Sequence, residues 1–295
     1  MTLPTQAQLT IVVLTFNEER NLDACLASLA PLVAPMFVVD SGSTDRTVEI
    51  SRRFGAQVVV HAFETHARQW RWAFEHLPIQ TEWVLALDAD QRLTTELAEE
   101  IASTLAAGTD ADGLFLNRRQ IFRGRWIRHG GYYPKYLLKC FRRSAVSIDE
   151  RDLVDHHFAV RGRVHRLQHD LIEDNRNEAE IFTWTAKHNR YAVLQARQEL
   201  AMGLLASAST EDIDPASPDA AVRRQKAIWG RLPLYVRPCL YFFYRYVLRL
   251  GFLDGKEGFI FHLLQGFWYR LLVDINVDEM RRGSGNSRPR GHESA

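Results

Sequence analysis

Between Leu9 and Leu105, apolar runs of strand length alternate with stretches of helical spacing. This alternation is typical of βαβ units, in which helices cover the faces of a parallel sheet. The first run is apolar without strict alternation, as in a parallel strand that is covered on both faces. We therefore predict an α/β fold with a mostly parallel sheet flanked by helices. Strands are expected at Leu9–Thr15, Met36–Asp40, Gln57–Val60 and Trp83–Leu87, and helices at Asn21–Leu29 and Thr47–Phe54, the second capped by Asp45.

Polar residues follow three of these strands. In an open α/β sheet, ligands bind outside the carboxyl ends of the strands, so these positions are candidates for a site. A single polar strand end is explained equally well by helix capping, but three on one edge of the sheet favour ligand binding. The three segments are Thr15-Phe16-Asn17-Glu18-Glu19, Asp40-Ser41-Gly42-Ser43-Thr44-Asp45 and Asp88-Ala89-Asp90.

Asp88 and Asp90 lie side by side after a buried strand. Two adjacent carboxylates are stable when a hard cation lies between them, or between them and a phosphate. On its own this spacing is common in ordinary turns, and its place after Val84–Leu87 is what favours a metal site. The first strand is followed by no G-x-G-x-x-G, which argues against a Rossmann dehydrogenase.

Together, in order and spacing, the three segments resemble the nucleotide-binding half of family 2 glycosyltransferases, which have the GT-A fold. A narrower resemblance, to the lipopolysaccharide-core and extracellular-polysaccharide β-glucosyltransferase type, is carried by Trp126–Pro134, Val154–Phe158, Lys187–Ala192 and Gly251–Gly255. The resemblance implies an inverting transfer from a UDP-sugar with Mg²⁺ or Mn²⁺ as cofactor, and makes Asp90, with Asp88, the metal site. It places these residues at the nucleotide sugar: Thr15, Asn17, Glu18, Glu19, Asp40, Ser41 and Asp88.

A general base must deprotonate the acceptor hydroxyl in such a reaction. The resemblance points at Asp155-His156, but His156 stands where relatives have a glutamate. We therefore take Asp155 as the base and His156 as the alternative. The neighbouring acids Asp149, Glu150 and Asp152 are further candidates, or members of a solvated loop.

Basic and aromatic residues alternate from Asn117 to Arg143. Such a mixture can bind single-stranded nucleic acid, but guanidinium groups also match phosphates and aromatic rings stack on sugars. The 37 basic and 36 acidic side chains nearly cancel, which argues against nucleic acid as a partner. We expect Arg128, and Lys187 further along, to lie near the donor diphosphate. The expected acceptor is acidic or carries a lipid diphosphate. The alternative is that these cations only cover the protein surface.

Three cysteines without C-x-x-C spacing suit a reducing compartment, and no basic, apolar leader is seen at the start. The expected location is the cytoplasm, peripheral on the inner face of the plasma membrane. The predicted organisation is a catalytic domain over 1–206, divided near 110, a linker over 207–229, an amphipathic helical extension over 230–280, and a disordered tail over 281–295.

The apolar runs of the extension are too short to span a bilayer, and their arginines and aromatic rings are typical of interfacial helices. Packing on the catalytic domain would select similar residues, so this alternative stays open.

The leading function is transfer of a hexose from a nucleotide diphosphate sugar to a saccharide or lipid-linked acceptor in cell-surface polysaccharide or lipopolysaccharide synthesis. One alternative is a nucleotidyltransferase, which would need a glycine-rich, lysine-bearing loop after the first strand, and Thr15–Glu19 is not one. Another is a membrane-associated binding subunit with a degenerate catalytic domain, for which His156 is the best support.

Overall fold

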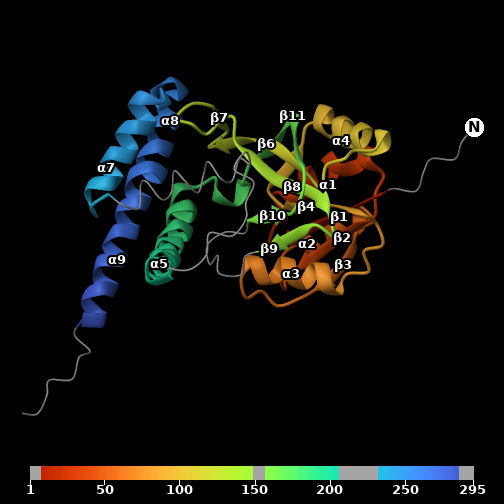
Figure 1. Ribbon diagram of the computed structural model, residues 1–295, viewed down its shortest axis with the longest axis horizontal. Coiled ribbons are helices and arrows are strands. Elements are labelled where there is room, and N and C mark those ends of the chain that lie inside the picture. The colour runs from red at the N-terminus through yellow and green to blue at the C-terminus, as the bar shows by residue number, and fades with distance from the viewer. Residues whose placement is uncertain (1–7, 149–156, 206–231, 286–295) are drawn as a thin grey trace, which may run out of the picture.

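The computed structural model describes residues 8–148, 157–205 and 232–285. A twisted sheet forms one half of the molecule, and a layer of C-terminal helices stands beside it (Figure 1). The nine strands of the main sheet are β1 Leu9–Thr15, β2 Met36–Asp40, β3 Gln57–Val60, β4 Trp83–Asp88, β5 Gln91–Leu93, β6 Gly113–Phe122, β7 Arg125–Ile127, β8 Tyr136–Arg142 and β11 Val164–Glu173. A small antiparallel pair consists of β9 Val146–Ile148 and β10 Phe158–Val160.

The strand order is β3-β2-β1-β4-β8-β6-β11-β5, with β7 paired to β6. The first four strands are parallel, and the four strands predicted from the sequence have the expected bounds to within one residue. Beyond β4 the sheet changes character, because β8 is antiparallel to both β4 and β6, and β5 is antiparallel to β11. The predicted mostly parallel sheet is thus a mixed one, and only the part formed by β1 to β4 is parallel throughout.

Helices cover both faces of the sheet. They are α1 Leu22–Leu29, α2 Thr47–Arg53, α3 His66–His76 and α4 Thr95–Ala107, with the short helix η1 at Ala30–Leu32. Ile11 and Val13 of β1 face a core shared with α1, α2 and α4, whereas Val12 and Leu14 face the core under α3. Alternate residues of β1 thus pack into two different hydrophobic cores, which explains why the strand is apolar on both faces.

The two predicted helices form, with small shifts at their ends. The first begins at Leu22, and Asn21 precedes it. The second is preceded by Arg46, so Asp45 lies one residue further out than predicted. Asp45 still accepts a hydrogen bond from the backbone N of Thr47 at 2.9 Å, which satisfies one of the free N–H groups of the first turn.

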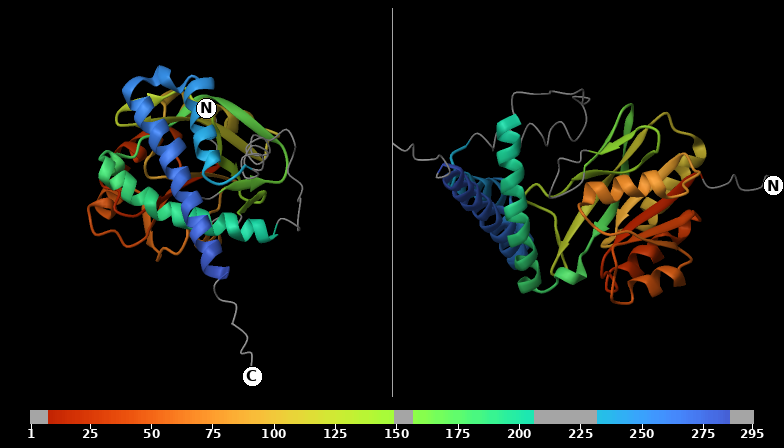
Figure 2. Two further views of the ribbon diagram at one scale, coloured as in Figure 1. Left: turned by 90° about the vertical axis from the view of Figure 1, so that its left-hand side faces the viewer. Right: turned by 90° about the horizontal axis from the view of Figure 1, so that it is seen from below.

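The remaining helices form the second layer. They are η2 Arg176–Glu178, α5 Ile181–Leu205, α7 Val236–Phe243, η3 Tyr244–Leu248, η4 Gly251–Asp254, α8 Gly255–Phe261, η5 His262–Trp268 and α9 Tyr269–Gly285, of which η3 and η5 are π-helical. Figure 2 shows α5 crossing α9. Their contact is apolar, with Ala192 and Ala196 packed among Tyr269, Val273 and Val277.

This layer differs from the predicted domain organisation in two respects. The helix α5, expected within the catalytic domain, packs on α9 of the extension. The tail was expected to be disordered from residue 281, yet α9 continues to Gly285. The predicted linker, 207–229, and the rest of the tail lie outside the described residues. In the described ranges no helix combines the length and apolarity that a bilayer span requires.

A buried ion pair ties α7 to α5 and α9. Asp274 is fully buried and accepts hydrogen bonds from Arg237 Nε at 2.5 Å and from the backbone N of Tyr235 at 2.7 Å. The same guanidinium donates to Glu199 of α5 at 2.7 Å. A buried guanidinium that loses its partner costs much more free energy than an exposed one.

Asp274→Ala leaves Arg237 with Glu199 as its partner and removes the acceptor of Tyr235 N, so it is expected to lower the free energy of unfolding by about 1–3 kcal/mol. The matched control is Glu279→Ala on the same helix, where the side chain is exposed and little stability should be lost. Denaturant titration of both variants measures the difference. Equal losses in the two variants would show that the buried pair does not hold this layer together.

Candidate functional site

Thr15 and Asp40 end two neighbouring strands and face each other in the register of the sheet. Asp40 is 1% exposed, and Thr15 donates to its Oδ1 at 3.0 Å. The loop after β2 turns back on the same carboxylate, with Ser43 Oγ at 2.5 Å and the backbone N atoms of Gly42 and Ser43 at 3.0 and 2.8 Å. Four donors thus satisfy Asp40, which makes it the organising centre of this loop.

The loops after β1 and β2 are joined to each other. Asn17 has a left-handed backbone, with φ of 54°; its N donates to Ser43 Oγ at 2.8 Å, and its Oδ1 accepts from Thr44 N at 2.8 Å. The backbone N of Glu19 donates to Asp45 at 3.1 Å. Ser41 donates its backbone N to Thr15 O at 2.9 Å. These predicted site residues therefore form one continuous edge, on which Phe16 is exposed.

Glu18 turns away from this edge toward the end of β11. Its Oε2 accepts from Asn21 Nδ2 at 2.6 Å and from Asn177 Nδ2 at 3.0 Å. Burial raises the pKa of Glu18 to about 7, and the charges of Asp88 and Glu178 add to that effect, while the Asn21 hydrogen bond and Lys187 oppose it. The raised pKa of Glu18 is thus mainly a consequence of burial, to which its acidic neighbours contribute.

The segment after β11 was not recognised from the sequence as part of the site. Asn175 Oδ1 accepts from Asn21 Nδ2 at 3.2 Å, and the backbone N of Arg176 donates to Asn21 Oδ1 at 2.9 Å. Asn177 also donates to the carbonyl of Asn17 at 3.0 Å. The criterion applied to the first strands, polar residues where a strand ends, could have revealed this segment. Glu173-Asp174-Asn175 is another such strand end.

Asp88 and Asp90 differ in their surroundings. Asp88 Oδ2 pairs with Lys139 Nζ at 2.8 Å, and this lysine is buried on β8. Asp90 lies in the turn between β4 and β5, where burial, and then the charges of Glu173, Asp88 and Glu18, raise its pKa well above its usual range. Across the described residues no ion pair forms to Asp90, so it is the carboxylate that most needs an external cation.

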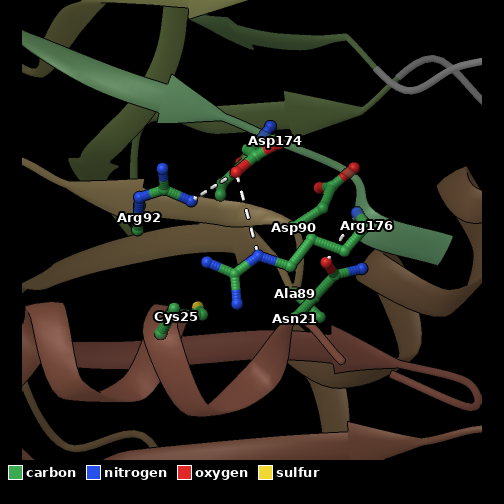
Figure 3. Close-up of a pocket in the computed structure, with 9 residues that line it drawn as sticks. Asn21, Cys25, Ala89, Asp90, Arg92, Asp174 and Arg176 are labelled. Carbon is green, nitrogen blue, oxygen red and sulfur yellow. Dashed lines mark hydrogen bonds and ion pairs between the residues drawn. The ribbon is translucent and has the colours of Figure 1, made fainter. Parts of the chain in front are cut away.

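A small pocket lies beside Asp90. Asn21 and Cys25 of the α1 region line it, together with Arg92, Asp174 and Arg176 (Figure 3). Asp174 pairs with Arg92 at 3.0 Å and lies 3.8 Å from Arg176 Nε. Two guanidinium groups thus stand close to the acidic turn.

Lys187 projects from α5 to the same place. It pairs with Glu178, which also accepts from Asn175 Nδ2 at 2.9 Å. Burial alone would lower the pKa of Lys187, but the charges of Glu178, Tyr191 and Asp90 outweigh it and raise the pKa. The structure therefore places this lysine, as a cation, in the field of the acidic turn.

Arg128 directly follows β7, at the end of the hairpin that β7 forms with β6. Its guanidinium is 5.3 Å from the centre of the Trp126 ring, and that of Arg119 is 4.8 Å from it. Arg119 also pairs with Asp170 at 2.5 Å, and Tyr133 Oη donates to the same carboxylate at 3.1 Å. Arg128 and Arg119 thus lie on the same aromatic ring, and the role predicted for Arg128 near the donor diphosphate stays a prediction.

The proposed base lies outside the described residues. Asp155 and His156, with Asp149, Glu150 and Asp152, fall between Ile148, where β9 ends, and His157.

The donor set at the acidic turn fits a divalent cation that is shared with a phosphate. In the described part of the chain, no three histidine, cysteine or acidic side chains converge on one metal position. A protein-only cage is therefore not built there. Mg²⁺ at nucleotide sites characteristically takes one or two carboxylates and completes its shell with phosphate oxygens and water. Asp90, without a cation of its own, suits that role, whereas Asp88 is neutralised by Lys139.

Known proteins resemble this chain in sequence. The model of the family "Glycosyl transferase family 2" matches residues 10–166. An uncharacterized glycosyltransferase of Rickettsia bellii is 34% identical over 95 residues, which span 32% of this chain and 32% of that protein. The lipopolysaccharide core biosynthesis glycosyltransferase LpsC of Rhizobium meliloti is 26% identical over 205 residues, 66% of this chain and 73% of that protein.

Among solved structures, residues 1–349 of S. aureus TarS in complex with UDP-GlcNAc superpose with a TM-score of 0.48 at 15% identity, over 93% of this chain and 92% of that one. The family model covers more than half of the 295 residues, and it includes the acidic turn and both loops of the edge. This chain therefore belongs to glycosyl transferase family 2.

Proposed function

We propose that this protein is an inverting glycosyltransferase that moves a hexose from a UDP-sugar to a saccharide or lipid-linked acceptor. The observation that carries the proposal is the carboxylate of Asp90, which has no ion pair with any described residue and lies at the carboxyl ends of the strands among further acids. Family membership and the likeness to a lipopolysaccharide core glycosyltransferase support the reaction class and favour an acceptor of cell-surface polysaccharide or lipopolysaccharide synthesis.

The acidic turn is proposed to hold the diphosphate through a divalent cation. Asp90 is the direct ligand, and Mg²⁺ or Mn²⁺ would neutralise the charge of the diphosphate leaving group. Lys187 and Arg176 supply fixed positive charge beside the turn. Arg128, which contacts the Trp126 ring, is proposed to lie near the donor diphosphate.

The nucleoside is proposed to lie along the edge formed by the loops after β1 and β2. Thr15 and Asp40 fix the position of this edge, and Ser41, Asn17 and Glu19 shape it. If Asp40 accepts directly from the base, one of its four present donors must give way. Asp155, or His156 in its place, is proposed as the general base toward the acceptor.

The C-terminal helices are proposed to bring the enzyme to the inner face of the plasma membrane as a peripheral protein. Support comes from their large apolar side chains that face outward, among them Phe243, Leu248 and Leu253. Contiguous apolar surface of this kind marks interaction sites.

The metal role predicts a specific loss in Asp90→Asn. A cation that stabilises a leaving group is worth several kcal/mol, so transfer should fall by about 10²–10³-fold or more. The matched control is Asp23→Asn, whose carboxylate lies on the exposed side of α1 in a surface pair with Arg53. Release of UDP from a panel of UDP-sugars, with Mn²⁺ or with EDTA, measures the effect. Wild-type rates in Asp90→Asn, or full activity in EDTA, would refute the role.

The base is tested by Asp155→Asn and His156→Ala. Deprotonation of the acceptor contributes typically 10²–10⁴-fold, so Asp155→Asn should lower transfer by about that factor, with a smaller loss in His156→Ala. Calorimetry with UDP should show unchanged nucleotide affinity in both. The reverse order would assign proton removal to the imidazole, and normal rates in both variants would move the search to Asp152 and Glu150.

A further inference from the structure

Large apolar side chains are exposed along one stretch of the helical layer. On α7 and η3 they recur at helical spacing, at Leu240, Phe243 and Val247. A second series follows beyond the turn, at Phe252, Phe259 and Leu263. Single exposed apolar residues are ordinary on a protein surface, but a contiguous set of them marks a surface that binds another molecule.

The turn between the two series is the most exposed part. Leu248, Leu250 and Leu253 are each at least 47% exposed. Leu250 also has a left-handed backbone, with φ of 60°. This conformation is strained for a branched side chain and free of strain for glycine. A leucine in this backbone conformation, with its side chain exposed, indicates that the side chain makes a contact with a binding partner.

The charge around the turn is positive. From Val236 to Leu263 the chain has four basic residues and two acidic ones, and one of the acids, Asp254, is buried. Arg249 and Lys256 are exposed beside the apolar side chains. The hairpin of β6 and β7 lies next to α8 (Figure 1), and the guanidinium of Arg125 approaches Gly255. The apolar turn thus has a cationic border to which the catalytic sheet contributes.

The inner side of the same turn is fixed to the catalytic domain. Gly130 N donates to the carbonyl of Arg249 at 2.9 Å, and Arg245 Nε donates to the carbonyl of Gly130 at 2.7 Å. His129 reaches the buried Asp254 through its backbone N at 2.8 Å and its Nδ1 at 2.6 Å. An added Cβ on Gly130 would collide with the ring of His262, so the fit is close. Whatever binds the turn therefore binds at a fixed orientation to the sheet.

We propose that the turn Val247–Leu253 docks on the surface of an anionic lipid bilayer and so sets the orientation of the catalytic domain on the membrane. The inference rests on the membrane contact proposed above and names the element that makes it. Apolar side chains with a cationic border match the acyl boundary and the anionic headgroups of such a surface. A second copy of the chain fits less well, because a twofold contact would bring the same cations, Arg249 and Lys256, together.

The test uses the full-length protein and flotation with vesicles of phosphatidylcholine, with and without phosphatidylglycerol. Leu250→Gly relieves the backbone and removes one inserted side chain, so binding to anionic vesicles should weaken about tenfold or more without loss of thermal stability. The matched control is Val33→Gly. Val33 also has positive φ, at 45°, and is 84% exposed, but it follows η1, which packs on α4 in the other half of the molecule.

Lys256→Glu should weaken binding only where phosphatidylglycerol is present. If Leu250→Gly and Val33→Gly both float like the wild type, the turn is not the docking element, although membrane contact itself would stand. If the wild type never floats and Leu250→Gly instead converts a dimer to a monomer in sedimentation, a second copy covers the turn and the inference is overturned. UDP release by the same samples in solution reports on the proposed reaction independently.

Discussion

The structure depends on how negative charge is balanced at the carboxyl ends of β1, β4 and β11. Carboxylates from four segments meet there, and most have a cation of their own. Lys139 pairs with Asp88, Arg118 pairs with Glu173 at 2.9 Å, and Lys187 pairs with Glu178. Asp90 lacks such a partner within the described ranges, and burial together with its acidic neighbours raises its pKa. Glu18 likewise has only asparagines as side-chain partners in these ranges. We propose that this excess of negative charge binds a cation, which a nucleotide diphosphate would bring with it.

This balance connects segments that are far apart in the chain. Asn21 bonds to Glu18 on one side and to Asn175 and the backbone of Arg176 on the other. The asparagines carry no charge, so they can join acidic segments without changing the net charge of the site. Lys187 adds α5, and α5 packs on α9, so the helical layer is linked to the acidic turn by packing as well as by charge. Movement of this layer would therefore change the surroundings of Asp90.

The nucleotide-binding half was predictable because its signals are local. An apolar run such as Leu9–Thr15 predicts a strand, and the polar residues at its end indicate a site. Neither prediction depends on the rest of the chain. The mixed half was not predictable, because the neighbours of an antiparallel strand such as β8 depend on long-range pairing. No local sequence pattern indicates that Lys139 pairs with Asp88 across the sheet. The hydrogen bond between His129 and Asp254 joins residues 125 positions apart, so no sequence spacing predicts it either. Arg128 was assigned to the donor because it lies in a basic and aromatic run, and its contact with the Trp126 ring could be read only from the structure.

The central claim is that Asp90 holds the cation that holds the diphosphate. Crystals of the full-length chain grown with UDP and Mn²⁺ test it most directly, because manganese is located by its anomalous scattering. If the claim is right, the metal lies within about 2.3 Å of an Asp90 carboxylate oxygen and is bridged to the diphosphate, while Asp88 keeps its bond to Lys139. Manganese bound away from Asp90, or UDP bound along the same edge with no metal between it and the acidic turn, would contradict the claim.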